Sequence, residues 1–275
     1  MRTLLTLIAM AGVGLVALTV VMLILERHFI YFPLPTLVVR PGDVHLAHED
    51  VFFVAEDGVK LHAWLLPVEG ARLTVLVCHG NAGNISHRLH RASLLQSRLG
   101  VSVLLFDYRG FGQSGGQTDE AGTYRDARAA YRFLVETKGR KPEEIVLFGE
   151  SLGAAVAAQL ALERPARALV MESPFASIPD MARAAYPFLP PVGPFIRTRY
   201  DTIGKIHALK MPLLLLHGDR DGLIPLAQGR RVFDAAPEPK RLYVIPGAGH
   251  NDTYSVGGDA YWAVWREFLE SPTPR

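Results

Sequence analysis

The sequence predicts an α/β protein built around a mostly parallel sheet. Short apolar, β-branched runs alternate along the chain with longer stretches that have the composition of helices. This alternation is typical of strand–helix units stacked into a parallel sheet. The run at 72–80, "RLTVLVCHG", is apolar almost throughout, as expected of a strand that is buried on both faces. Roughly 250 residues follow the N-terminal apolar run, which is enough for one domain with a large core.

The expected elements follow one another in a regular order. The sheet begins with two strands in 51–68, joined by a turn at Asp57-Gly58, which makes its start antiparallel. A helix is expected at 85–100, closed by Gly100. The further strands are expected at 72–80, 101–108, 144–150, 168–173, 212–218 and 241–247, and the further helices at 121–137, 154–163 and 260–270.

The N-terminal run Thr3–Leu25 contains 23 residues and no charge. As a helix it would span the roughly 30 Å hydrocarbon core of a bilayer. A secretory signal has a shorter apolar region, about 7–15 residues, and ends at a small-residue cleavage site. We therefore expect an uncleaved single-pass membrane anchor, with a cleaved signal as the alternative. Phe29, Tyr31 and Phe32 are then expected at the membrane interface.

Charge gives a weaker indication of topology and partners. Arg2 precedes the apolar run, while Glu26 and Arg27 offset each other after it. The positive-inside tendency favours a cytoplasmic N-terminus and a domain on the exported, periplasmic or extracytoplasmic side. The single cysteine, Cys78, rules out an intramolecular disulfide and carries no information about export. The net charge of +2, without a block of like charges, gives no support for a nucleic-acid partner.

One glycine motif indicates a dinucleotide site only at first sight. The segment Gly110–Gly115 follows G-x-G-x-x-G, directly after an expected strand. A dinucleotide motif needs its last glycine to open a helix, and an acidic residue about 20 positions further on. Here the next helix begins several residues later, and Glu136 lies inside it. We expect a structural loop in which Asp107 and Arg109 pair locally.

The segment Gly149–Gly153 follows G-x-S-x-G, with an expected strand before it and an expected helix after it. In this context Ser151 occupies a strained turn with positive φ, where side chains at 149 and 153 would clash. A serine hydroxyl becomes an effective nucleophile when a base, itself oriented by a carboxylate, takes its proton. Ser151 is therefore the candidate nucleophile, and the N–H of Leu152 is an expected oxyanion donor.

The expected order on such a fold is serine, then acid, then histidine, each after a strand. Asp219 and Asp221 both follow the strand at 212–218, and His250 follows the strand at 241–247. His250 is the candidate base because the competing histidines precede the acid. The spacing of Asp219 and Asp221 in the sequence does not show which of the two is the acid.

These motifs resemble the α/β-hydrolase superfamily of serine hydrolases and, within it, the membrane-anchored BEM46-like branch. The resemblance implies an α/β-hydrolase fold, Asp221 as the acid, Asp219 as a turn cap, and the N–H of Asn81 as the second oxyanion donor. Many lipases have H-G-G-G where this chain has "HGNAG". The matching segments are "HGNAGN" (79–84), "FDYRGFGQSGG" (106–116), "GESLG" (149–153), "ESPF" (172–175), "HGDRDGLIP" (217–225) and "GHND" (249–252).

The segment at about 176–210 is expected to form a short lid with an apolar middle. Near a bilayer this favours an acyl substrate, and packing of the same residues against the sheet is an equal alternative. The apolar residues are Tyr186, Phe188, Leu189, Pro190, Pro191, Val192 and Phe195.

The sequence thus predicts a membrane-anchored serine hydrolase that cleaves ester or thioester bonds of small-molecule or lipid acyl substrates. Residues 3–25 are expected to be the anchor, 26–48 a juxtamembrane linker and 49–275 the catalytic domain. We expect no cofactor and no metal ion, and the oligomeric state is not indicated. An acyltransferase with the same triad and a non-catalytic binding module are the alternatives.

Overall fold

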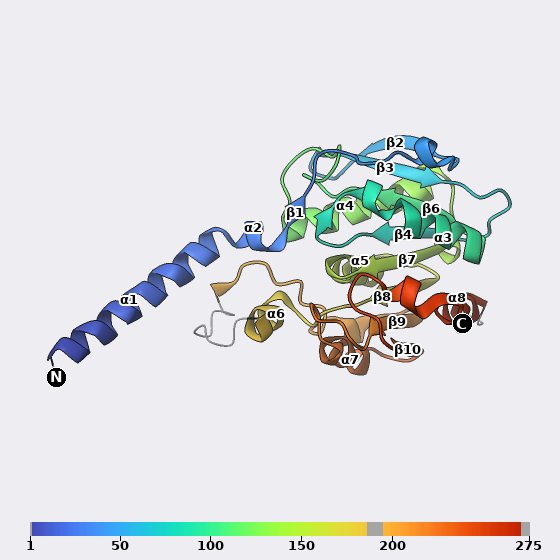
Figure 1. The fold of residues 1–275 in the computed structure, drawn as a ribbon. Coiled ribbons are helices and arrows are strands. Elements are labelled where there is room, and N and C mark those ends of the chain that lie inside the picture. The colour runs from blue at the N-terminus through green and yellow to red at the C-terminus, as the bar shows by residue number, and fades with distance from the viewer. Residues whose placement is uncertain (1, 186–194, 271–275) are drawn as a thin grey trace.

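Eight strands form the central sheet of the computed structural model, which describes residues 2–185 and 195–270 (Figure 1). The order across the sheet is β10-β9-β8-β7-β4-β6-β3-β2. Strand β3 pairs antiparallel with β2 and β6, and the other pairs are parallel. This confirms the predicted sheet and its antiparallel start. The strands are β2 (Glu49–Val54), β3 (Lys60–Leu66), β4 (Thr74–Cys78), β6 (Ser102–Phe106), β7 (Ile145–Glu150), β8 (Ala168–Glu172), β9 (Leu213–Gly218) and β10 (Lys240–Ile245).

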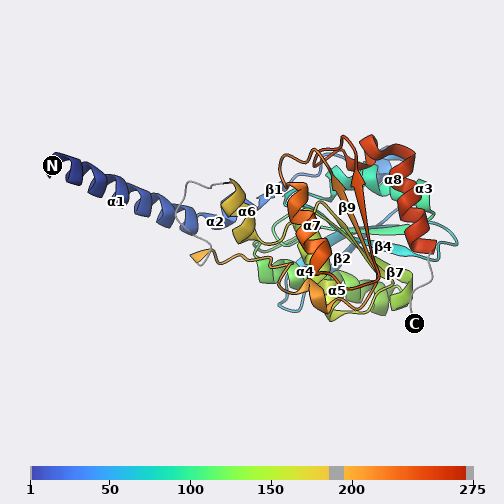
Figure 2. The same cartoon turned by 90° about the horizontal axis from the view of Figure 1, so that it is seen from below.

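Helices cover both faces of the sheet, as Figure 2 shows from below. On one face, α3 (Leu89–Leu99) and α8 (Thr253–Glu270) pack in a core that contains Trp64 and Val77. On the other face, α4 (Glu120–Arg132), α5 (Leu152–Glu163) and α7 (Leu226–Ala235) pack in a core with Leu76. Strands β4 and β6 are buried along their whole length, because a parallel sheet between two helical layers has no solvated face.

The expected helices are present, with differences at their ends. The segment 85–100 starts as a single 3₁₀ turn before α3, and Gly100 ends it with φ of +65°. The last helix begins earlier than expected and is kinked at Gly258, where φ is +51°. Three α-helices among the described residues were not predicted: α2 (Glu26–Ile30), α6 (Ile178–Ala185) and α7. Helix α7 gives a weak signal because a glycine interrupts its segment, and Gly229 and Val232 are its buried residues.

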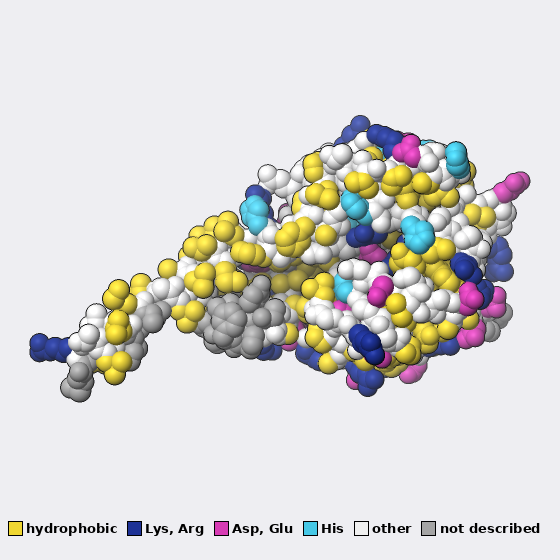
Figure 3. Space-filling model, in the orientation of Figure 1, with side chains coloured by type: hydrophobic (Ala, Val, Ile, Leu, Met, Phe, Trp, Pro, Cys, Tyr) yellow, Lys and Arg dark blue, Asp and Glu magenta, His cyan; other side chains and the backbone are white. Residues whose placement is uncertain are grey.

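The helix α1 (Arg2–Ile24) extends away from the domain (Figure 1). It is long and apolar enough to cross a membrane, a test that a signal sequence also passes. Most of the hydrophobic side chains described on this helix are exposed (Figure 3). Met22 and Leu23, near its end, are partly buried. The predicted run is therefore helical up to Ile24.

The chain returns to the domain directly after α1. The short helix α2 (Glu26–Ile30) leads into β1 (Phe32–Pro33), which pairs in parallel with β5 (Ala82–Gly83). Tyr31 is buried, and its hydroxyl lies 3.0 Å from that of Tyr200. The prediction that Tyr31 lies at a membrane interface is therefore wrong, because the pairing of β1 with β5 places Tyr31 inside the domain. Phe29 and Phe32 remain 54% and 51% exposed.

The loop after β6 is structural, but its predicted ion pair is wrong. Arg109 binds Asp126 and Asp57, at 2.8 and 2.7 Å, rather than Asp107. Asp107 is fully buried and accepts a hydrogen bond of 2.9 Å from the N–H of Ile85. The partners of Arg109 come from a distant helix and a distant turn, so proximity in sequence misleads here.

The expected lid at 176–210 contains α6 and a 3₁₀ turn, Ile206–Ala208. Most of its predicted apolar middle, from Tyr186 to Val192, lies outside the described residues. Phe195 lies within them and is 67% exposed.

Candidate active site

Ser151 stands on the turn between β7 and α5 with φ of 55° and ψ of −120°. A non-glycine residue with positive φ is uncommon and is held in place only by its surroundings. A side chain at position 149 would collide with the carbonyl of Gly153, and one at position 153 would collide with the carbonyl of Cys78. Glycine at both positions lets the turn close, which confirms the strained turn expected from the sequence.

Asp221 holds His250 in one orientation. The Nδ1 of His250 lies 2.7 Å from the Oδ2 of Asp221. A carboxylate only accepts hydrogen bonds, so the proton lies on Nδ1 and leaves Nε2 free to accept one. The other oxygen of Asp221 accepts the N–H groups of Leu223 and Ile224, at 2.9 and 2.7 Å. Burial alone would raise the pKa of Asp221, but these hydrogen bonds outweigh it and hold the pKa below its ordinary value.

The two aspartates after β9 have different surroundings. Asp219 is exposed, and its carboxylate accepts the N–H of Gly247 at 2.7 Å, which joins two neighbouring loops. Asp221 is buried, and it is the aspartate that contacts His250. The geometry therefore agrees with the assignment that the family resemblance implied and that spacing left open.

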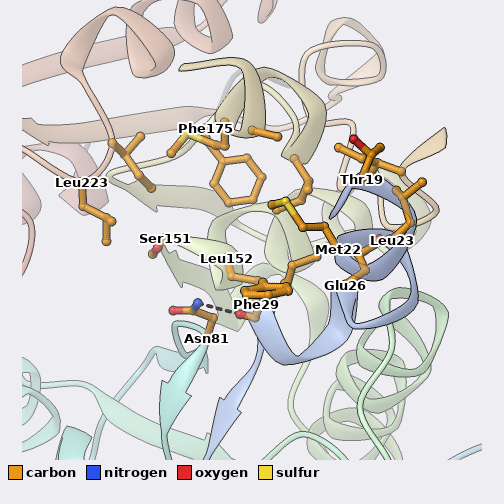
Figure 4. Close-up of a pocket in the computed structure, with 16 residues that line it drawn as sticks. Thr19, Met22, Leu23, Glu26, Phe29, Asn81, Ser151, Leu152, Phe175 and Leu223 are labelled. Atoms are coloured by element: carbon orange, nitrogen blue, oxygen red, sulfur yellow. Dashed lines mark hydrogen bonds between the residues drawn. The ribbon is translucent and has the colours of Figure 1, made fainter. Parts of the chain in front are cut away.

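A cavity of about 270 Å³ opens beside Ser151 (Figure 4). Both expected oxyanion donors, Asn81 and Leu152, line it with Ser151. Leu223 and Ile224, from the loop that holds Asp221, line it too. The remaining lining residues are Thr19, Met22, Leu23, Glu26, Phe29, Ile30, Phe175, Ile178, Met181, Ala182 and Ile196.

Two backbone N–H groups at this cavity are available as donors. Leu152 is the first residue of α5, and the first N–H groups of a helix have no partner inside the helix. The N–H of Asn81 makes no hydrogen bond within residues 2–185 and 195–270. The side chain of Asn81 donates to the carbonyl of Ile30 at 2.7 Å, which is the dashed line in Figure 4.

The five expected site residues thus form two groups. Ser151, Leu152 and Asn81 line the cavity, while Asp221 and His250 are hydrogen-bonded to each other. The Ser151 hydroxyl makes no hydrogen bond within the described part of the chain. Hydrogen bonds between catalytic groups are often long without substrate and tighten in the complex.

A buried charged network lies behind Ser151, and sequence reasoning missed it. Glu150 and Glu172 are register partners on β7 and β8. Arg91 lies between them, 2.6 Å from Glu172 and 3.5 Å from Glu150, and Arg88 also pairs with Glu150. Burial alone would raise the pKa of Glu150, but the two arginines and the N–H of Gly80 lower it to about 2.

This network fixes three parts of the site at once. Glu150 is adjacent to Ser151 and accepts the N–H of Gly80, which precedes Asn81, at 3.3 Å. Glu172 accepts the hydroxyl of Thr253 at 2.7 Å, three residues after His250. The signal in the sequence was a glutamate at the end of each of two buried strands, since a buried charge needs a partner.

In the part of the chain that the structure describes, no group of three or more His, Cys, Asp or Glu is arranged to hold a metal ion. His79, which competed with His250 for the role of base, is buried, and its Nδ1 donates to the carbonyl of Gly80 at 2.7 Å.

The fold and this site define an α/β hydrolase. The family model described as serine aminopeptidase, S33, matches residues 69–203. An uncharacterized protein of Mycobacterium tuberculosis, Rv2307c, is 42% identical over 263 residues, which cover 94% of this chain and 93% of the relative. The bem46 protein of Schizosaccharomyces pombe is 33% identical over 243 residues, 83% of this chain and 79% of the relative.

Among solved structures, the esterase Pf2001 of Pyrococcus furiosus matches with a TM-score of 0.72 at 24% identity, over 88% of this chain and 97% of the esterase. That likeness shows the fold. The identity with bem46 and the other relatives shows that the chain belongs to the BEM46-like branch of the α/β-hydrolase superfamily, as the motifs in the sequence predicted.

Proposed function

We propose that this protein is a membrane-anchored serine hydrolase that cleaves ester or thioester bonds of acyl substrates through an acyl-enzyme. The observation that carries the proposal is the position of Ser151 on a strained turn that opens on a mostly apolar cavity. The pair of Asp221 and His250, with Nε2 free to accept a proton, supports the same assignment.

In the proposed mechanism the Ser151 hydroxyl attacks the carbonyl carbon of the substrate while Nε2 of His250 takes its proton. The N–H groups of Asn81 and Leu152 stabilise the oxyanion of the tetrahedral intermediate. Collapse of the intermediate breaks the ester or thioester bond, and His250 returns the proton to the leaving oxygen or sulfur. Water, activated by His250, then hydrolyses the acyl-enzyme, and Asp221 stabilises the imidazolium in both steps.

The lining of the cavity supports an apolar acyl group rather than the amino terminus of a peptide. Glu26 is the charged residue among the described lining residues. Its two carboxylate oxygens accept the backbone N–H groups of Arg197 and Thr198, at 3.1 and 2.6 Å. A carboxylate engaged in this way is poorly placed to receive the ammonium group of a peptide.

The helix α1 supports membrane anchoring by its length and apolar surface. The positions of Arg2, Glu26 and Arg27 favour a catalytic domain on the exported side. A cleaved signal sequence is the alternative. Detection of the uncleaved N-terminus in membrane fractions would support an anchor, and a mature soluble protein that lacks Thr3–Leu25 would contradict it.

The proposed activity is tested with the full-length protein in detergent and p-nitrophenyl esters of increasing chain length. We expect turnover by the wild type and a loss of at least about 10³-fold in kcat for Ser151→Ala. Wild-type activity that persists in Ser151→Ala would contradict the proposed nucleophile. Analysis of the products then separates hydrolysis, which yields the free acid, from transfer of the acyl group to an added alcohol or thiol.

A further inference from the structure

The end of α1 contributes one wall of the cavity at Ser151. Thr19, Met22 and Leu23 are partly buried, whereas their neighbours Val21 and Ile24 are exposed. Their spacing of three and four residues places them on one face of the helix. All three line the cavity, and Figure 4 shows them beyond Phe175 on the far side from Ser151.

The segment after α1 is hydrogen-bonded to the loops around the site. The N–H of Phe32 donates to the carbonyl of Asn81 at 2.8 Å, and the side chain of Asn81 donates to the carbonyl of Ile30 at 2.7 Å. These two hydrogen bonds tie the segment to an expected oxyanion donor. Glu26 holds the backbone at Arg197 and Thr198, as described above. These contacts hold the segment that directly follows the wall against the site.

We propose that the end of α1 is a functional part of the active site, and that the cavity takes the acyl chain of a membrane lipid between α1 and the domain. The inference rests on the proposed function and names its substrate class. The cavity reaches Thr19, about 7 Å along the helix from Ile24. If α1 spans the bilayer, that point lies at the depth of lipid acyl chains. A cavity of about 270 Å³ is near the lower end of ligand pockets, so it fits an acyl chain rather than a whole lipid.

This arrangement gives a specific path for the substrate. The acyl chain enters the cavity along the apolar face formed by Thr19, Met22 and Leu23, and its carbonyl reaches Ser151 at the other end. The chain then remains in apolar surroundings from the bilayer to the site. The length of chain that fits is set by the side chains of α1, so the membrane helix determines specificity.

The first test compares Met22→Trp with Val21→Trp in the full-length protein, in nanodiscs or detergent. Both variants place the same side chain on the same turn of α1, but Val21 is 49% exposed and is not a lining residue. The readout is the ratio of kcat/KM for p-nitrophenyl laurate to that for the acetate. We expect Met22→Trp to lower this ratio at least tenfold and Val21→Trp to leave it unchanged. Equal ratios in both variants and the wild type would overturn the proposal.

A second variant, Met22→Ala, guards against misfolding of the tryptophan variant. A smaller side chain lengthens the cavity, so we expect the optimum to move to a longer acyl chain. An optimum that stays where it is in the wild type would count against the proposal. If the wild type hydrolyses no ester of any length, the proposed function itself fails and this inference falls with it.

A direct test uses an alkyl fluorophosphonate with a diazirine at the end of its chain. The probe would phosphonylate Ser151 with loss of fluoride, and light would then crosslink the end of its chain to the nearest protein atoms. We expect crosslinked peptides that contain Thr19, Met22 or Leu23. Crosslinks found only in the domain, with none in α1, would overturn the proposal.

Discussion

The two sides of Ser151 are built from opposite kinds of residue. Behind it, Glu150 and Glu172 lie side by side on neighbouring strands and are neutralised by Arg88 and Arg91. In front of it, the cavity is lined mostly by apolar side chains. The rear is built from β7, β8 and the helix α3 region, which belong to the core of the fold, whereas the front comes from α1, α6 and the loop after β9.

This difference suggests that the charged rear supports the reaction, whereas the apolar front selects the substrate. The buried charges at the end of β7 and β8 hold Ser151, the loop of Asn81 and the loop of His250 in place, because each charge needs its partner to remain buried. Apolar side chains on peripheral segments can change size without leaving a charge unpaired. Substitutions at the rear should therefore alter rate or stability for every substrate, and substitutions at the front should alter the choice of substrate.

The largest effect is expected for Asp221→Asn. The amide can donate to Nδ1 of His250 and so favours the wrong tautomer, with Nε2 protonated and unable to accept the serine proton. A substitution of this kind typically lowers kcat by about 10⁴-fold. Steady-state kinetics on short esters measure it. The matched control is Asp219→Asn, which removes a charge two residues away that does not contact His250. Comparable losses in both variants would contradict the assignment.

The next effect concerns stability at the rear. Glu172→Gln leaves Arg91 deep in the protein with one of its two carboxylates gone, and loss of a buried ion-pair partner typically costs about 3–5 kcal/mol. Urea unfolding, followed by tryptophan fluorescence, measures the change. Glu56→Gln serves as control, because Glu56 pairs with Arg128 at the surface, where such a pair contributes at most about 1 kcal/mol. Equal free energies of unfolding for Glu172→Gln and Glu56→Gln would show that the buried charged network does not stabilise the fold.

Asn81→Asp tests the junction between the two sides. The carboxylate cannot donate to the carbonyl of Ile30 and repels it, so the loop that carries the Asn81 N–H should shift. Complete loss of one oxyanion donor typically costs about 10²–10³-fold, and we expect a displaced donor to cost roughly tenfold in kcat with little change in KM. A change confined to KM would indicate that Asn81 contacts the ground state instead.

The smallest effect is a pH dependence of stability. The pKa of Glu150 is about 2 in the folded protein, against an ordinary value of 4.5. Since the folded value is the lower one, the stabilisation is present above about pH 4.5 and is lost as the pH falls towards 2. Melting temperatures between pH 6 and pH 3 should fall less steeply for Glu150→Gln than for the wild type. Parallel curves would contradict the low pKa.

The parts predicted from the sequence are those with local signals. The strands follow from apolar runs, and the turn at Ser151 follows from glycines that must flank it. Arg109 was paired wrongly because its true partners, Asp57 and Asp126, are brought close by tertiary structure. Tyr31 was misplaced because β1 and β5 pair over two residues each, which leaves no pattern to detect.

Spacing predicted the site only up to the choice between Asp219 and Asp221, and the family resemblance made that choice in favour of Asp221. Both aspartates follow the same strand, and the folded loop shows that Asp221 contacts His250. The role of α1 was hidden for a different reason. Thr19, Met22 and Leu23 look like any other residues of an apolar helix, and their distinction appears only where the helix end meets the cavity.

The most direct measurement is labelling of the full-length protein with a long-chain fluorophosphonate, followed by intact mass and peptide mapping. We expect one adduct per chain, located on Ser151, and none in Ser151→Ala. An adduct on another residue, or an unlabelled wild type, would contradict the claim that Ser151 is the nucleophile of an acyl-binding site.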